Sequence, residues 1–202
     1  MKILGITGPS GAGKSLLSDE LRKLNIKVIN ADEVYHSLLV PPSDCLTAIR
    51  NTFGDGVFED TGALSRQRLA SVVFNDKEKL TLLNSTVLPF VLNEIRRIIS
   101  ASDGALIAVD APTLIESGFN KDCDAVISVL CPSETRLERI IARDNVTRKA
   151  AAERIRAQKP DSFYTDASDA VIINDKDQSE LQKKLLCVLE ELFPDIILEE
   201  RK

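Results

Sequence analysis

Histidine, closely spaced cysteines and long apolar runs are all scarce in this sequence, and each scarcity argues against a class of protein. His36 is the single histidine, and the four cysteines lie far apart without a C-x-x-C pair. We therefore expect no zinc site and read the cysteines as buried thiols in a reducing cytosol. No apolar stretch approaches the length of a membrane span, and the apolar start runs into glycines rather than a cleavage site. We expect a cytoplasmic protein without a signal peptide or a membrane partner.

The charge balance argues against a nucleic-acid partner. The 202 residues include 26 Lys and Arg against 31 Asp and Glu, for a formal net charge of -5. Proteins that bind a phosphate backbone usually carry a basic footprint, so the expected partner is a small molecule, which a local basic patch could hold. A hydrophobic content of 44% supports a packed core, and we expect one domain over residues 1–202. The sequence leaves the oligomeric state open.

Short apolar runs alternate with helical patterns along most of the chain. The alternation predicts an α/β fold, with a mostly parallel sheet of about five strands flanked by helices on both faces. The predicted strands are residues 2–7, 27–30, 105–110, 125–130 and 170–173. Residues 32–101 form helical patterns without a clear strand and predict a helical insertion between the second and third strands.

Polar residues suggest where two later helices begin. Ser133 is the predicted N-cap of the first, and Ser179 with Gln182 forms a predicted capping box for the second. Residues 147–158 are polar with one small apolar stripe, which predicts an exposed helix rather than a core element.

A glycine-rich stretch follows the first predicted strand. Residues 8–15, GPSGAGKS, fit G-x-x-x-x-G-K-[ST], with the strand before and the helix after that this phosphate-binding loop requires. Glycines let backbone N–H groups turn inward around an anion, and the following helix adds its positive end. The motif predicts a P-loop NTPase-like fold that binds a nucleotide such as ATP. The predicted nucleotide-binding residues are Gly8, Pro9, Ser10, Gly11, Ala12, Gly13, Lys14, Ser15 and Leu16.

A magnesium site is expected beside this loop. The Ser15 hydroxyl is the predicted first ligand of Mg²⁺, and Lys14 is expected to reach the β- and γ-phosphates. Asp110 ends an apolar strand, as a Walker-B-like acid does, and is the predicted second ligand, directly or through water. The alternative role for Asp110 is to cap a loop at the end of the strand.

The type of phosphate chemistry follows from motifs that the sequence lacks. No D-x-x-G switch, N-K-x-D base reader or L-S-G-G-Q stretch occurs, which argues against a GTPase and a transporter ATPase. A small-molecule kinase remains, and it needs a base near the acceptor hydroxyl. Asp32 follows the second strand at the edge where ligands of open α/β sheets bind, and is the predicted base. Its alternative role is a helix N-cap, and both roles are compatible.

Arginines recur at helical spacing in the segment "RLERIIARD". Arg136, Arg139 and Arg143 share one helical face. A solvated face is the plain interpretation of such a run. Because a transferring phosphoryl group needs positive charge, we predict instead a lid at about residues 133–160 in which Arg139 and Arg143 act on the phosphates. Arg136, Arg154 and Arg156 are weaker candidates.

Taken in order, these motifs resemble the dephospho-coenzyme A kinase family over nearly the whole chain. The similar segments are GITGPSGAGKS, INADEV, FGDGVFEDTGALSR, VDAPTLIESG, RLERIIARD with RIRAQ, and DAVIIND. The resemblance implies ATP- and Mg²⁺-dependent phosphorylation of the ribose 3′-hydroxyl of dephospho-CoA, the last step of coenzyme A synthesis. It implies Asp32 as the base and Asn174 near the adenine. The candidate acceptor-site residues are Asp32, His36, Arg66 and Asp110. The alternative for His36 is an exposed helix histidine, and the alternative for Arg66 is a surface salt bridge.

The chain departs from the usual residues of that family at Asn30, His36, Pro42, Leu88 and Thr113. Two alternatives therefore stay open. One is a kinase for another nucleoside or nucleotide acceptor. The other is a nucleotide-binding regulatory protein that has lost catalysis.

Overall fold

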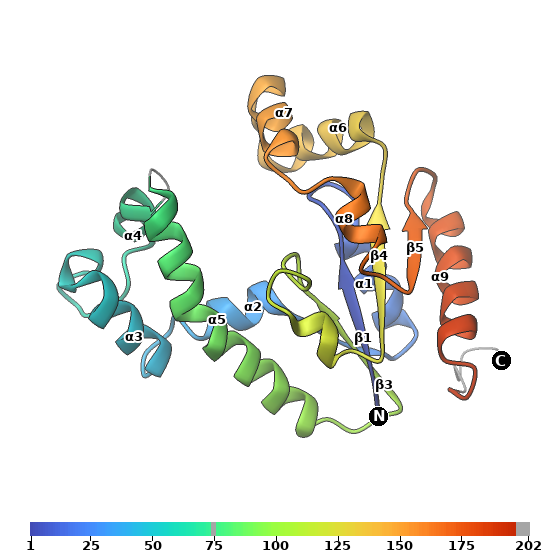
Figure 1. Ribbon diagram of the computed structural model, residues 1–202, viewed down its shortest axis with the longest axis horizontal. Helices are drawn as coiled ribbons and strands as arrows, with labels where there is room; N and C mark the ends of the chain where they lie inside the picture. The colour runs from blue at the N-terminus through green and yellow to red at the C-terminus, as the bar shows by residue number, and fades with distance from the viewer. Residues whose placement is uncertain (74–75, 197–202) are drawn as a thin grey trace. The chain divides into compact units, whose positions relative to one another are not determined.

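The computed structural model describes residues 1–73 and 76–196 (Figure 1). The strands are β1 (Lys2–Thr7), β2 (Lys27–Asn30), β3 (Leu106–Asp110), β4 (Ala125–Leu130) and β5 (Ala170–Ile173). The α-helices are α1 (Lys14–Lys23), α2 (Ala31–Ser37), α3 (Asp44–Phe53), α4 (Arg66–Val73), α5 (Lys77–Ser100), α6 (Ser133–Asp144), α7 (Arg148–Arg156), α8 (Asp161–Thr165) and α9 (Gln178–Leu192). Two short 3-10 helices are η1 (Asp55–Val57) and η2 (Phe119–Asp122).

The chain divides into two compact units. The first comprises Met1–Ile29 and the chain from Asp103 onward, and the second comprises Asn30–Ser102. The second unit covers nearly the residues of the predicted helical insertion, and its acceptor-binding role stays a prediction. Within the described ranges, no helix is long and apolar enough to cross a bilayer.

The first unit is built on a five-stranded sheet in the order β2-β3-β1-β4-β5. The central strand β1 pairs in parallel with β3 and β4, and β4 pairs in parallel with β5. The residues of β3 and β4 are buried on both faces of the sheet. The helices α1 and α9 pack in one cluster with Leu4, Ile6 and Ile127, which are fully buried. The predicted parallel sheet is confirmed, and only β3 begins one residue later than predicted.

Two helix starts differ from the sequence-based expectations. Pro132 precedes α6, so Ser133 is the first helical residue rather than its cap. The side chain of Asp177 caps α9 by accepting from the N–H of Glu180, so the predicted capping box of Ser179 with Gln182 is wrong. Each predicted cap lies within two residues of the actual one. Several residues near each helix start can act as the cap, and the sequence alone does not show which of them does.

The second unit is helical and is organised around α5. This helix packs against α2, α3 and α4, and the small core between them includes Cys45, Ile49 and Phe58. The helix pair formed by α6 and α7 belongs to the first unit. There Ala151 of α7 is fully buried against Leu137 and Ile140 of α6, while most other residues of α7 are exposed, as its polarity and single apolar stripe predicted.

Candidate phosphate-binding site

Residues 8–15, called the phosphate loop below, connect β1 to α1 in a conformation that requires glycine. Gly8 has φ 138°, and a Cβ on it would lie 2.2 Å from the backbone oxygen of Val129. Gly13 has φ 99°, and a Cβ there would lie 2.0 Å from Nδ2 of Asn174. Both positions therefore require glycine, because the backbone has a positive φ and a side chain would clash with Val129 or Asn174.

The start of α1 offers positive charge and backbone donors at the end of the loop. Gly13 precedes the helix and no side chain caps it, and a helix start of this kind is a common site for anions. Lys14 folds back over the loop, and its Nζ donates to the carbonyl oxygens of Gly8 at 2.7 Å and Pro9 at 3.2 Å. Ser15 is exposed in the first turn, and Leu16 is half-buried. The loop thus has the parts needed to hold phosphate groups.

Three arginines of α6 reach the phosphate loop. Nε of Arg136 donates to the carbonyl oxygen of Ser10 at 3.1 Å. Nη1 of Arg139 lies 3.4 Å from the carbonyl oxygen of Gly11 and 3.3 Å from that of Ala12, and Nη2 of Arg143 lies 3.3 Å from Oγ of Ser10. The helical face predicted from the spacing therefore contacts the loop, and the Arg143 side chain at its end is 59% exposed. Arg136, ranked below the other two from sequence, is the most buried of the set, at 4% exposed.

Two further side chains bind the backbone of the loop. Asn174, which follows β5, donates its amide to the carbonyl oxygen of Ala12 at 2.8 Å and is buried. Gln158, just beyond α7, accepts from the N–H of Ser10 at 3.1 Å. The contact of Asn174 shows a direct part in holding the loop, and its place near an adenine stays a prediction. The family resemblance placed Gln158 in the lid segment RIRAQ, and the structure adds its contact with the loop backbone.

A carboxylate joins the ends of α6 and α7. Asp144 accepts from Nε of Arg143 at 2.7 Å and from Nη2 at 2.9 Å, and it also pairs with Arg154. The hydrogen bonds from Arg143 are the main cause that lowers the pKa of the Asp144 carboxyl to about 2. Two of the predicted lid arginines therefore share one acidic partner.

Asp110 lies at the carboxyl end of β3 with its carboxylate buried. Oδ2 of Asp110 accepts a hydrogen bond from Oγ of Ser18 at 2.7 Å, and the two residues are 4% and 1% exposed. Ser18 lies one turn after Ser15 on α1 and was missed in the sequence, because it lies outside the phosphate-loop motif. This hydrogen bond comes from a helix side chain, and the loop-capping alternative for Asp110 stays a prediction.

The predicted metal ligands suit Mg²⁺ in kind. A hydroxyl and a carboxylate are hard oxygen donors, and Mg²⁺ is usually held by one or two protein groups together with phosphates and waters. Residues 1–73 and 76–196 contain no cluster of three or more His, Cys, Asp or Glu that could hold a metal ion.

The predicted acceptor residues Asp32, His36 and Arg66 belong to the second unit, and all three are exposed. Asn30 is the N-cap of α2, because its side chain accepts from the N–H groups of Asp32 at 2.9 Å and Glu33 at 3.2 Å. The capping alternative for Asp32 is therefore wrong. The His36 ring lies 5.6 Å from that of Tyr35. Burial raises the pKa of the Tyr35 phenol, and the positive charge of Arg66 opposes that rise.

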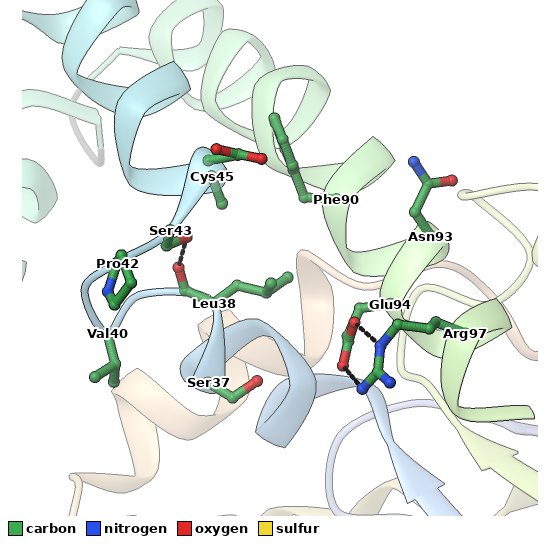
Figure 2. Close-up of a pocket in the computed structure, with 11 residues that line it drawn as sticks. Ser37, Leu38, Val40, Pro42, Ser43, Cys45, Phe90, Asn93, Glu94 and Arg97 are labelled. Atoms are coloured by element: carbon green, nitrogen blue, oxygen red, sulfur yellow. Dashed lines mark hydrogen bonds and ion pairs between the residues drawn. The ribbon is translucent and has the colours of Figure 1, made fainter. Parts of the chain in front are cut away.

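A pocket of about 360 Å³ lies in the second unit, between the end of α2, the start of α3 and α5 (Figure 2). Figure 2 shows Leu38 and Phe90 beside it, with the ion pair of Glu94 and Arg97 along its rim. Its lining comes from side chains other than the predicted acceptor residues. The pocket consequently does not bring those residues together.

Comparison with known proteins identifies the family. The model of the dephospho-CoA kinase family matches residues 2–180. The chain is 32% identical over 192 residues to a dephospho-CoA kinase of Lactobacillus johnsonii, covering 94% of this chain and 97% of that one. It is 33% identical over 193 residues to a dephospho-CoA kinase of Carboxydothermus hydrogenoformans, covering 94% of each. The solved dephospho-CoA kinase of Campylobacter jejuni is similar with a TM-score of 0.68 and 26% identity, over 95% of this chain and 98% of that one. With a phosphate loop, an arginine helix against it and a family match over almost its full length, the chain belongs to the dephospho-CoA kinase family.

Proposed function

We propose that this protein transfers the γ-phosphoryl group of ATP to the ribose 3′-hydroxyl of dephospho-CoA, giving coenzyme A and ADP. The observation that carries the proposal is the convergence of three α6 arginines on the phosphate loop of a chain in this family. Such a site holds a triphosphate and offsets the charge that spreads over its oxygens during transfer. The family supports dephospho-CoA as the acceptor over another nucleoside or nucleotide.

The loop and the arginine helix bind the phosphates. Lys14 leaves its loop carbonyls to meet the β- and γ-phosphates, and the N–H groups at the start of α1 point at the same oxygens. Arg139 and Arg143 lie beside Gly11, Ala12 and Ser10, where they meet the group in transfer. These cations stabilise the transition state and fix the phosphates in line with the acceptor.

Ser15 and Asp110 are the residues of this chain that would hold Mg²⁺. Bound there with the phosphates, Mg²⁺ supplies neutralisation of charge on the β- and γ-phosphate oxygens. Ser18 holds the carboxylate of Asp110 by its hydroxyl, so the orientation of a buried ligand is set before the metal binds.

Replacing Ser18 with alanine is expected to raise the Mg²⁺ concentration needed for half-maximal turnover by about 10-fold, as loss of a supporting contact does in other metal sites. The buried carboxylate of Asp110 loses the hydroxyl donor, so the free energy of unfolding should also fall by about 1–3 kcal/mol. Mg²⁺ titrations of turnover and of the ADP-dependent rise in melting temperature measure the first effect. Ser85→Ala, at an exposed serine of α5, is the control. An unchanged Mg²⁺ requirement in both titrations would remove Ser18 from the metal site.

Asp32 acts as the base in this proposal. As the bond from the ribose oxygen to the γ-phosphorus forms and the bond from that phosphorus to the ADP oxygen breaks, the hydroxyl proton passes to the Asp32 carboxylate. Its exposure leaves it accessible to an acceptor, and the cap at Asn30 fixes the first turn of α2 that carries it. His36 and Arg66 bind the acceptor from the same unit in this proposal.

An acceptor screen tests the function. The purified protein is supplied with Mg²⁺, ATP and one acceptor at a time: dephospho-CoA, adenosine, AMP and other nucleosides and nucleoside monophosphates. ADP release and mass spectrometry of the product are the measurements, and we expect phosphorylation of dephospho-CoA on the 3′-oxygen. A higher kcat/KM with any other acceptor would assign a different substrate. Saturable ATP binding without transfer to any acceptor would indicate a regulatory protein.

A further inference from the structure

Ser10 of the phosphate loop has all three of its polar groups bonded to one neighbouring region. Its N–H donates to Oε1 of Gln158 at 3.1 Å, and its carbonyl oxygen accepts from Nε of Arg136 at 3.1 Å. Its hydroxyl accepts from Nη2 of Arg143 at 3.3 Å. Two of these partners lie on α6, and Gln158 lies two residues beyond α7. Ser10 therefore connects the phosphate loop to the helix pair formed by α6 and α7.

One side-chain oxygen completes this connection. Oε1 of Gln158 accepts from the Ser10 N–H and also from Nη2 of Arg136. The backbone of Gln158 is itself held in a turn, because its N–H donates to the carbonyl oxygen of Ile155 at 3.2 Å. A single acceptor therefore links the loop, α6 and the end of α7.

The guanidinium of Arg136 depends on these oxygens. Its side chain is 4% exposed, and its Nη1 lies 3.8 Å from the carboxylate of Asp161, which is 59% exposed. A buried cation must have its hydrogen bonds satisfied, and here they go to Ser10 and Gln158. Removing the amide of Gln158 thus disturbs both the loop and the arginine beside it.

Packing between α6 and α7 has a separate cause. Leu137 and Ile140 of α6 bury Ala151 of α7, with Val146 and Ile155 packed around them. This apolar contact holds the two helices together without help from Gln158. What Gln158 adds is a hydrogen-bonded connection between this helix pair and the phosphate loop.

We propose that Gln158 is a positioning residue, whose shared oxygen fixes the α6–α7 helix pair on the phosphate loop and so aligns Arg139 and Arg143 before the nucleotide binds. The inference rests on the proposed function, since it assigns those arginines to ATP. Gln158 acts through the arginines and the loop and does not itself react.

Two variants of Gln158 test the inference against a purely structural role. Gln158→Ala removes the shared acceptor, so kcat should fall by about 10- to 100-fold, as a small misplacement of catalytic groups does. The melting temperature should stay within about 4 °C of the parent, because the apolar contact between α6 and α7 remains. Gln158→Glu keeps an oxygen for both bonds, so kcat should stay within threefold of the parent. Its added negative charge beside the phosphates should raise KM for ATP.

Gln182→Ala, at an exposed glutamine of α9, is the matched control and should behave as the parent. Amide exchange at Ser10, followed by NMR without nucleotide, gives a readout independent of activity: it should be faster in the alanine variant and near the parent rate in the glutamate variant.

Three results would overturn the inference. Gln158→Ala could keep kcat within twofold of the parent, or its lower kcat could be accompanied by a drop in melting temperature large enough to explain it. Gln158→Glu could also lose as much kcat as Gln158→Ala does. Failure of the parent protein to bind ATP would instead overturn the proposed function, while the Ser10 exchange rates would still report whether Gln158 fastens the loop.

Discussion

Replacing Lys14 with alanine is expected to lower kcat/KM for ATP by about 10²–10³-fold, the loss seen when one preorganised donor to a developing charge is removed. Lys14 is the first residue of α1, and its Nζ donates hydrogen bonds to the carbonyl oxygens of Gly8 and Pro9 in the phosphate loop. No neighbouring residue of the loop carries a positive side chain, so the phosphates lose their nearest ammonium group. Steady-state kinetics with dephospho-CoA in excess measure the effect.

Ligand-dependent stability separates this effect from damage to the fold. A ligand present at 100 times its dissociation constant stabilises the native state by about 2.7 kcal/mol, and this gain should appear for the parent and shrink for Lys14→Ala. Arg22→Ala is the control, because Arg22 is another cation of α1 and forms a surface ion pair with Asp19. Lys14 would lose its assigned role if its alanine variant showed the parent's nucleotide-dependent rise in melting temperature and its turnover.

Replacing Asp32 with asparagine is expected to lower kcat by about 10²–10⁴-fold, the usual contribution of a positioned general base. The amide cannot take the hydroxyl proton, while its shape and size are those of the carboxylate. KM for ATP should change little, because the predicted nucleotide ligands belong to other residues. Single-turnover kinetics with ATP and dephospho-CoA isolate the chemical step.

Glu33→Gln is the matched control for Asp32→Asn. Glu33 is the next residue of α2, is also exposed, and shares the Asn30 cap through its N–H. Both variants should unfold within about 2 °C of the parent, as is usual for exposed sites. Equal losses of kcat in the two variants would show that negative charge on this turn matters rather than a base at position 32, and parental kcat in Asp32→Asn would exclude Asp32 as the base.

The sheet could be predicted from the sequence because its strands are short apolar runs with clear ends. β1, β2, β4 and β5 begin and end at the predicted residues. The phosphate loop was equally clear, since glycines at fixed spacing between a strand and a helix have few other uses. These features are local, and local sequence determines them.

The contacts that complete the site could not be predicted, because they join residues far apart in sequence. Arg136 and Gln158 meet at Ser10, about 125 and 150 residues before them. Ser18 meets Asp110 in the same way. Arginines on polar helices are usually exposed to solvent. That Arg136 is buried becomes clear only from the packing of α6 against the loop. The apolar stripe of α7 was visible in the sequence, but its partners on α6 were not.

The shared acid at the end of α6 has a consequence for how nucleotide affinity is built up. Because Arg143 and Arg154 already have Asp144 as a counterion, under the proposed function an incoming phosphate would replace an anion rather than meet bare cations. The net electrostatic gain of binding a nucleotide there would be the difference between the two pairings.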